Sequence, residues 1–141
     1  LTLIHRTMEN FIYYDFEQFQ HGGRGCSLSP DKIRIYNVKG NRRVVVNPEV
    51  SERIVKSGMQ KLRVREDPYT GEIALIFNDE KGKMPADVKR IRSKSLIYNC
   101  AALVELLVRK LHLKDNRGGA FEVAFDQMRV GNRGVIITLK K

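Results

Sequence analysis

Residues 41–58, NRRVVVNPEVSERIVKSG, change their hydrophobic period at a single point. The β-branched run Val44–Val46 favours a strand. Asn47 can then cap a helix whose first position is Pro48, where the missing N–H and the fixed φ cost little. Apolar residues recur at helical spacing up to Gly58, so the sequence predicts a strand that leads directly into a short helix.

The residues on either side of this segment have the patterns of strands. KIRIYNV, residues 32–38, alternates isoleucine with basic residues as a half-buried strand does, and residues 39–41 supply a turn. Residues 59–79 combine an alternating strand, a turn containing Pro68 and Gly71, and an apolar strand. This pattern predicts a β-hairpin.

The second half of the chain repeats the order of strand, Asn-capped helix and hairpin. Residues 95–113 combine a short apolar strand, an Asn and an amphipathic helix, and residues 120–140 predict another hairpin. Laying Val46-Asn47 over Tyr98-Asn99 aligns the halves, which we interpret as an internal duplication. The predicted fold class is α+β, mainly β, with two βαββ-type units (strand, short helix, hairpin) and an N-terminal extension.

Four parts follow from this interpretation. They are an N-terminal aromatic extension (1–30), a first unit (31–80), a basic linker (81–94) and a second, divergent unit (95–141). The extension gathers five aromatic residues between positions 11 and 19 but little positive charge. We therefore expect it to pack on the main body, as core or interface, more readily than to stack on bases.

The charge of the chain favours a polyanionic partner. The 26 Lys and Arg residues exceed the 16 Asp and Glu residues, which gives a net charge of +10. Only Arg6 and Arg24 among the basic residues precede position 31, so the excess lies in the two units and the linker. Nucleic acid is the expected polyanion. A basic surface that serves solubility alone is the competing interpretation.

Other classes of protein lack support in the residues. Cys26 and Cys100 are far apart in a chain without an export signal, which favours reduced thiols. The three histidines have no zinc-ligand spacing, so neither a metal nor a cofactor is predicted. No nucleophile and base lie together by local spacing, and we expect no enzyme activity and no small-molecule substrate.

The expected location is the cytoplasm. The longest apolar run is too short to cross a bilayer, so no membrane association is predicted. The N-terminal LTLIHRTMENF lacks the basic start, apolar centre and cleavage site of a signal peptide. Met8 is a plausible start, and we assign residues 1–7 no function.

A family resemblance rests on Lys39–Val50, then Gly58, then the hairpin through Phe77. A basic residue ahead of an aliphatic run, a break into a short helix, a glycine and a hairpin resemble the AbrB/MazE/SpoVT group of swapped-hairpin DNA-binding domains. The resemblance covers residues 31–79 and, in a divergent copy, 95–140. Family members have a Gly-Arg-aliphatic-aliphatic-Pro pattern, whereas here Asn41-Arg42 and Asn47 interrupt it.

This resemblance implies a small swapped-hairpin barrel that binds double-stranded DNA and regulates transcription. Because both units lie in one chain, a single chain would form what two subunits form in single-copy relatives. The oligomeric state stays open, a homo-oligomer included. The implied nucleic-acid-binding residues are Lys39, Arg42, Arg43, Arg53, Lys56, Lys89, Arg90, Arg92 and Lys94.

Within this set, Arg42 and Arg43 are expected on opposite faces of their strand because neighbouring side chains alternate. We expect Arg43 to reach bases or phosphates, and the other residues to lie nearer the phosphates. The competing interpretation is that these arginines cover apolar edges with their stems and keep their heads in water. For Arg63 and Arg65, the solvated face of a strand is the favoured interpretation.

Two alternative functions remain open. One is a single-stranded DNA or RNA binder that stacks bases on the aromatic cluster. The other is a protein-interaction module, such as an antitoxin or a mobile-element accessory factor, that docks a partner through residues 8–30.

Overall fold

A computed structural model gives the structure of the protein and describes residues 10–16, 19–24, 28–57, 61–78, 94–114, 119–131 and 134–140. The strands in it are β1 (Ile12–Tyr14), β2 (Phe19–Arg24), β3 (Lys32–Val38), β4 (Asn41–Val46), β5 (Lys61–Glu66), β6 (Ile73–Asn78), β7 (Lys94–Asn99), β8 (Ala120–Gly131) and β9 (Gly134–Leu139). The helices are α2 (Pro48–Ser57) and α3 (Ala101–Lys110). The mainly β composition predicted from the sequence is confirmed.

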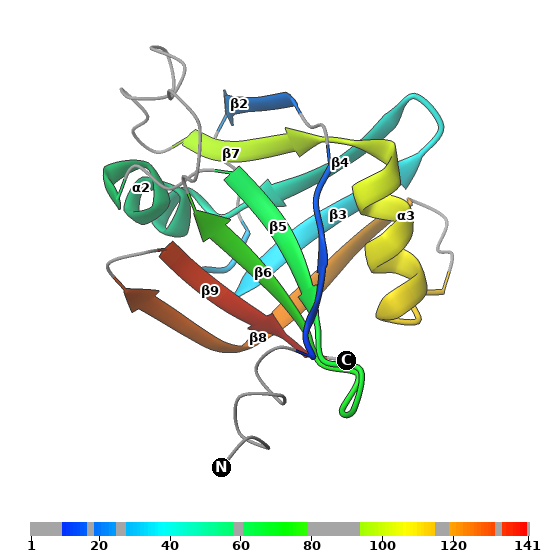
Figure 1. Ribbon diagram of the computed structural model, residues 1–141. Coiled ribbons are helices and arrows are strands. Elements are labelled where there is room, and N and C mark those ends of the chain that lie inside the picture. Colours follow the sequence, from blue (N-terminus) through cyan, green and yellow to red (C-terminus); the bar gives the residue numbers. More distant parts are fainter. Residues whose placement is uncertain are drawn as a thin grey trace.

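All strand pairs are antiparallel and form one curled sheet in the order β1-β5-β6-β9-β8-β3-β4-β7-β2 (Figure 1). The curl depends on the long strand β8. Its first residues pair with β3, its later residues pair with β9, and the register shifts between Phe125 and Gln127. Such an irregularity bends a strand and increases its twist. The result is a half-barrel whose inner face holds the core.

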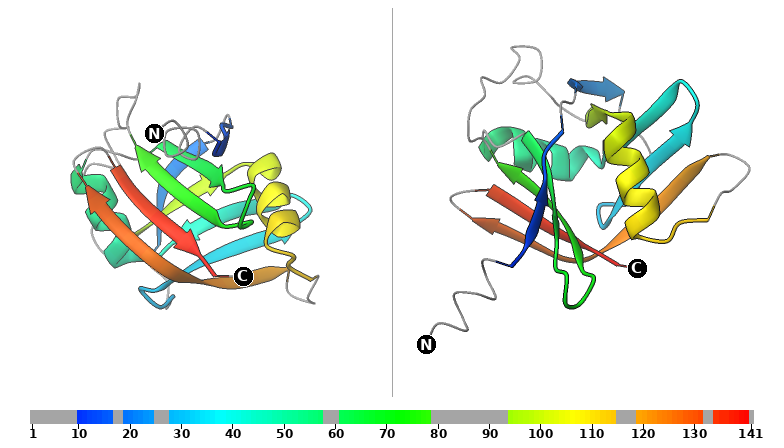
Figure 2. Two further views of the ribbon diagram at one scale, coloured as in Figure 1. Left: turned by 60° about the horizontal axis from the view of Figure 1, so that its bottom comes forward. Right: turned by 45° about the vertical axis from the view of Figure 1, so that its right-hand side comes forward.

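The core joins both halves of the chain. Its largest fully buried side chains are Tyr98, Phe77, Ile33, Ile35, Ile54, Leu62, Ile73, Leu75, Leu96, Leu103, Leu107 and Ile137. The rings of Phe77 on β6 and Tyr98 on β7 meet across the interior, with centroids 5.8 Å apart. Burying each side chain of this size contributes roughly 1.5–3 kcal/mol. The helices α2 and α3 lie at opposite ends of the sheet and bury their apolar faces in this same core (Figure 2).

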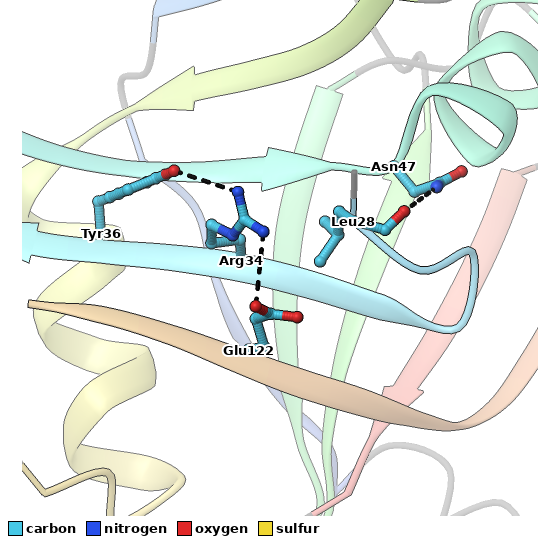
Figure 3. Close-up of polar contacts among 5 residues, drawn as sticks. All are labelled: Leu28, Arg34, Tyr36, Asn47 and Glu122. Carbon is cyan, nitrogen blue, oxygen red and sulfur yellow. Dashed lines mark hydrogen bonds and ion pairs between the residues drawn. The ribbon is translucent and has the colours of Figure 1, made fainter. Parts of the chain in front are cut away.

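Helix α2 begins where the sequence predicts. Asn47 Oδ1 accepts hydrogen bonds from the backbone N–H groups of Glu49 (2.7 Å) and Val50 (3.2 Å), which caps the first turn. Asn47 Nδ2 donates to the Leu28 carbonyl oxygen at 2.6 Å (Figure 3). One buried amide therefore ends β4, starts α2 and fixes the loop ahead of β3.

The corresponding expectation for the second helix is wrong. The N-cap of α3 is Cys100, which makes no side-chain capping bond. Asn99 is instead the last residue of β7 and pairs with Arg43 of β4. The strand in the second half thus runs one residue further than an Asn cap allows.

The two halves interleave within the sheet. Strands β4 and β7 pair with each other, and so do β6 and β9; each of these pairs joins one strand of residues 31–78 to one of residues 94–139. Strands β1 and β2, from the N-terminal extension, form the two edges. Tyr14 and Phe16 pack against the core, so this segment lies on the main body as expected. Of the predicted linker, only Lys94 lies within the described residues, as the first residue of β7.

Candidate nucleic-acid interface

The end of the β3–β4 hairpin is narrower than the rest of the sheet. Strand β8 pairs with β3 only as far as Tyr36, and β7 pairs with β4 only from Arg43 onward. Between these points residues 37–42, here named the hairpin end, form a ribbon of two strands (Figure 2). Lys39 is exposed at its turn, and Gly40 has a φ of 81°, which suits glycine at a turn position.

Arg42 faces α3. Its guanidinium forms an ion pair with Glu105 at 3.2 Å, and its Nε donates to Asn37 Oδ1 at 3.2 Å. These contacts hold the hairpin end against the helix. Because Arg42 is already paired, it has less capacity to bind a phosphate than the sequence suggested.

Arg43 points to the opposite, outward face of the sheet, as strand alternation predicts. Its guanidinium carbon lies 4.8 Å from the centroid of the Tyr36 ring, a cation–π distance. Its Nε is buried and has no hydrogen-bond partner among the described residues. The ring thus lies against the guanidinium of a residue that is half-buried as a whole.

Arg34 belongs to the same outward surface and was missed from the sequence. Its Nη1 donates to the Tyr36 hydroxyl oxygen, and its Nη2 approaches Glu122 on β8, both at 3.4 Å (Figure 3). The alternation in KIRIYNV already placed Lys32, Arg34 and Tyr36 on one face. The same alternation that predicts a strand therefore also indicates a shared face for these three side chains.

The remaining predicted residues divide into two groups. Arg53 and Lys56 are exposed on α2, with Lys56 paired to Glu52 at 3.0 Å. Helix α2 and the start of β7, where Lys94 lies, are at the far end of β4 from the hairpin turn (Figure 1). Strand β4 therefore separates them from Lys39 by roughly 20 Å. Lys89, Arg90 and Arg92 lie outside the described residues.

Arginine–aromatic contacts also occur at the β1 edge. Arg63 lies over Tyr13 at 4.9 Å and Arg65 over Phe11 at 4.4 Å, measured from guanidinium carbon to ring centroid. Arg63 also contacts Asp15 through two bonds of 2.5 and 3.2 Å. The first aromatic residues of the N-terminal extension are thus engaged within the chain, and Arg63 is less solvated than expected.

The described residues offer little support for other kinds of functional site. They contain no group of three or more His, Cys, Asp or Glu side chains that could hold a metal ion. No helix among them has the length and apolar character needed to cross a membrane. Comparison with protein-family models, with curated proteins and with solved structures gives no significant match.

Proposed function

We propose that the protein binds double-stranded DNA through the hairpin end and acts as a transcriptional regulator. The observation that carries the proposal is the width of this element. The major groove of B-DNA is about 12 Å wide and admits a two-stranded ribbon. Neighbouring strands lie about 4.8 Å apart, so the hairpin end fits into the groove, whereas the four-strand face that begins at the Tyr36–Arg43 pair is too broad to enter beyond this edge.

Charge supports the same orientation. From Lys32 to Pro48 the chain contains no acidic residue. The nearest carboxylate partners come from other elements: Glu105 pairs with Arg42 and Glu122 with Arg34. Lys39 at the turn and Arg43 on the outward face are the cations best placed to meet phosphates and bases.

The interleaving of the two halves supports a duplicated AbrB-like body. Each half supplies a strand, a helix and a hairpin, and the halves join through the β4–β7 and β6–β9 pairs. A duplicated swapped-hairpin barrel would have this arrangement, with the two units related by an approximate two-fold axis. In this proposal one chain suffices to form the body that contacts DNA.

A second candidate is single-stranded DNA or RNA. The stack of Arg43 on Tyr36, beside Arg34, lies on the broad outward face of β8, β3, β4 and β7. Single-strand binders stack bases on aromatic rings or guanidinium planes exposed on such faces. Strand preference in binding separates this candidate from the first.

Fluorescence anisotropy with random duplex and single-stranded oligonucleotides, across a salt series, tests the proposal. We compare wild type with the double variant Lys39→Ala, Arg43→Ala. The control is Arg53→Ala, Lys56→Ala, which removes the same charge from the far end of β4. Nonspecific duplex binding with a Kd of roughly 10⁻⁴–10⁻⁶ M is expected, and the double variant should lower the salt slope by roughly 0.9 for each of its two residues that neutralises a phosphate.

The control variant should keep the wild-type slope. Tighter binding to single strands than to duplex would favour the second candidate. Absence of binding to either nucleic acid at low salt would refute both, and would direct attention to residues 8–30 as a protein-docking segment.

A further inference from the structure

We infer that the outward face of the hairpin end, together with Arg43 directly behind it, reads base sequence, with Asn41 and Arg43 contacting an adenine and a guanine and Val38 contacting a thymine methyl group. The inference rests on the proposed function, because it requires the hairpin end to lie in a major groove. It adds to that proposal the residues that set specificity, of which Asn41 and Val38 have no other assigned role.

The register places these three side chains on one face. Val38 pairs with Asn41, and Tyr36 pairs with Arg43, so that Val38, Asn41 and Arg43 share the side away from α3. Asn41 is exposed, and Val38 keeps 41% of its surface exposed although it is apolar. Contact with a ligand would bury the exposed part of this apolar side chain.

The hairpin end is held from behind. The Asn37 backbone N–H donates to the Gly119 carbonyl oxygen at 2.6 Å, and Gly119, with a φ of 63°, lies directly against the Val38 side chain. Arg42 is bonded to Glu105 and Asn37. The contacts of Arg42 lie on the face toward α3, the bond to Gly119 lies at the edge of β3, and Gly119 covers part of Val38, so the hairpin end is rigid while Asn41 stays exposed on its outward face. Preorganisation of this kind reduces the entropic cost of binding.

The chemistry of the three side chains matches the major-groove code. Asn makes bidentate hydrogen bonds to adenine N6 and N7, Arg does so to guanine O6 and N7, and apolar side chains contact the thymine methyl group. The guanidinium of Arg43 lies over the Tyr36 ring, and its fork of N–H donors suits a bidentate contact. The two-stranded ribbon thus presents one adenine reader and one methyl contact, and Arg43, at the first pair behind the ribbon, presents one guanine reader.

Strand geometry fixes their spacing. Asn41 and Arg43 are two residues apart on β4, which corresponds to roughly 6.8 Å along the strand. Successive bases on one DNA strand rise by about 3.4 Å, so a ribbon lying along the groove spans two base steps between these residues. The expected recognition element is therefore an adenine and a guanine separated by one base pair, with the thymine next to the adenine or paired with it.

Selection of bound duplexes from a random library tests this inference with the full chain. Wild type should enrich an adenine and a guanine separated by one base pair. Asn41→Ala should lose the preference at the adenine, by about 10-fold or more, and Arg43→Ala should lose it at the guanine. Asn41 is exposed, so its substitution should leave the thermal midpoint unchanged.

Lys39→Ala is the matched control, because it lies in the same turn but would contact phosphates alone. It should weaken binding to all sequences equally and leave the selected element intact. Wild-type binding without this element, or an unchanged element in Asn41→Ala, would overturn the inference while the proposed function stands. Failure of wild type to bind any duplex would overturn both.

Discussion

Ser51 shows how one side chain can complete a sheet. It lies in α2, fully buried, and its hydroxyl donates to the Val46 carbonyl oxygen at 3.1 Å while accepting from the Leu96 backbone N–H at 2.9 Å. The β4–β7 pairing recorded from Arg43 to Val45 stops just before these two groups. The Ser51 hydroxyl thus bridges the two backbone groups where the next hydrogen bond between β4 and β7 would lie, and it joins α2 to both strands.

Ser51→Ala should lower the free energy of unfolding by roughly 1–3 kcal/mol, because it leaves a buried carbonyl and a buried N–H without their partner. Urea denaturation followed by circular dichroism measures this. Ser29→Ala is the control: it also removes a side-chain hydrogen bond, to Asp31, but at the surface. A loss for Ser51→Ala no larger than for Ser29→Ala would show that the bridge contributes little.

The two glycines that flank the β8–β9 turn should differ in tolerance. Gly134 has a φ of 154°, and a Cβ there would lie 2.5 Å from the Phe77 backbone oxygen, whereas a Cβ on Gly131 would meet nothing closer than 3.9 Å. Gly134→Ala should therefore destabilise the protein by more than about 1 kcal/mol. Gly131→Ala should be neutral or slightly stabilising, since it only removes freedom from the unfolded chain. Thermal melts of the two variants compare them directly, and equal midpoints would contradict the expectation.

Single-residue features were predictable only when they depend on neighbours in sequence. The Asn47 cap and the opposite faces of Arg42 and Arg43 follow from local spacing. The pairing of Arg34 with Glu122 joins residues 88 apart, and the bond from Leu96 to Ser51 joins residues 45 apart. No periodic pattern encodes which distant strand supplies a partner, so these contacts required the structure.

At the scale of elements, β1, β5 and α3 are joined by a small polar network. Glu66 on β5 accepts a hydrogen bond from the Tyr14 hydroxyl at 2.7 Å and pairs with Lys110 of α3 at 3.0 Å. The hydrogen bond from the Tyr14 hydroxyl to Glu66 raises the pKa of Tyr14 above its ordinary value of 10.0. The separate hydrogen bond from Lys110 to Glu66 raises the pKa of Lys110 above its ordinary value of 10.5. The network thus ties an edge strand and a helix end to one carboxylate.

Stability should consequently fall in alkaline solution. Both groups are protonated in the folded and unfolded states below about pH 10, where their contribution is complete. Above that pH the unfolded chain loses these protons first, so the contribution declines as pH rises through the folded pKa values. Urea denaturation of wild type and Glu66→Gln between pH 8 and 11, values chosen around the ordinary pKa, should show the steeper decline in wild type.

Desolvation also raises the pKa of buried Tyr98. Its contribution to the stability of the protein therefore declines with rising pH as well. It is unchanged in Glu66→Gln, so the difference between the two proteins isolates the Glu66 network. Parallel pH profiles would contradict the assignment.

The elements themselves were largely predictable, and their arrangement was not. The switch of period at Asn47-Pro48 predicts α2. An alternating strand, a turn and an apolar strand predict the hairpin β5–β6, and residues 120–140 predict the hairpin β8–β9. The prediction that Asn99 caps α3 is wrong. Asn99 follows an apolar strand as Asn47 does, but it belongs to β7, where it pairs with Arg43 of β4. Strand pairing that competes for a residue can thus override a local capping preference.

At the scale of the whole molecule, neither half has a complete sheet. A fragment spanning residues 28–78 would keep the β3–β4 and β5–β6 pairs but lose the pairing of β3 with β8, β4 with β7 and β6 with β9. It would also expose the apolar face of α2. We expect this fragment to be unfolded, with a random-coil far-ultraviolet circular dichroism spectrum and narrow amide dispersion in NMR.

The full chain prepared in parallel should unfold in one cooperative transition. Cooperative unfolding of the isolated fragment would show that the first half is an independent domain. Sequence patterns held no information on whether the halves stand apart or interleave, because both arrangements use the same strands and helices.

The pairing of β3 with β8 has a consequence for the time at which the protein can fold. Ribosomes add about 5–20 residues per second, so β8 leaves the ribosome roughly 4–18 s after β3. Throughout that interval β3 presents an unpaired edge with two buried-type isoleucines, Ile33 and Ile35. Lys32 and Arg34 alternate with them, and charged side chains on an open edge discourage pairing between nascent chains. We therefore expect Lys32 and Arg34, which lie on the surface of the folded protein, to discourage aggregation while the sheet is still incomplete.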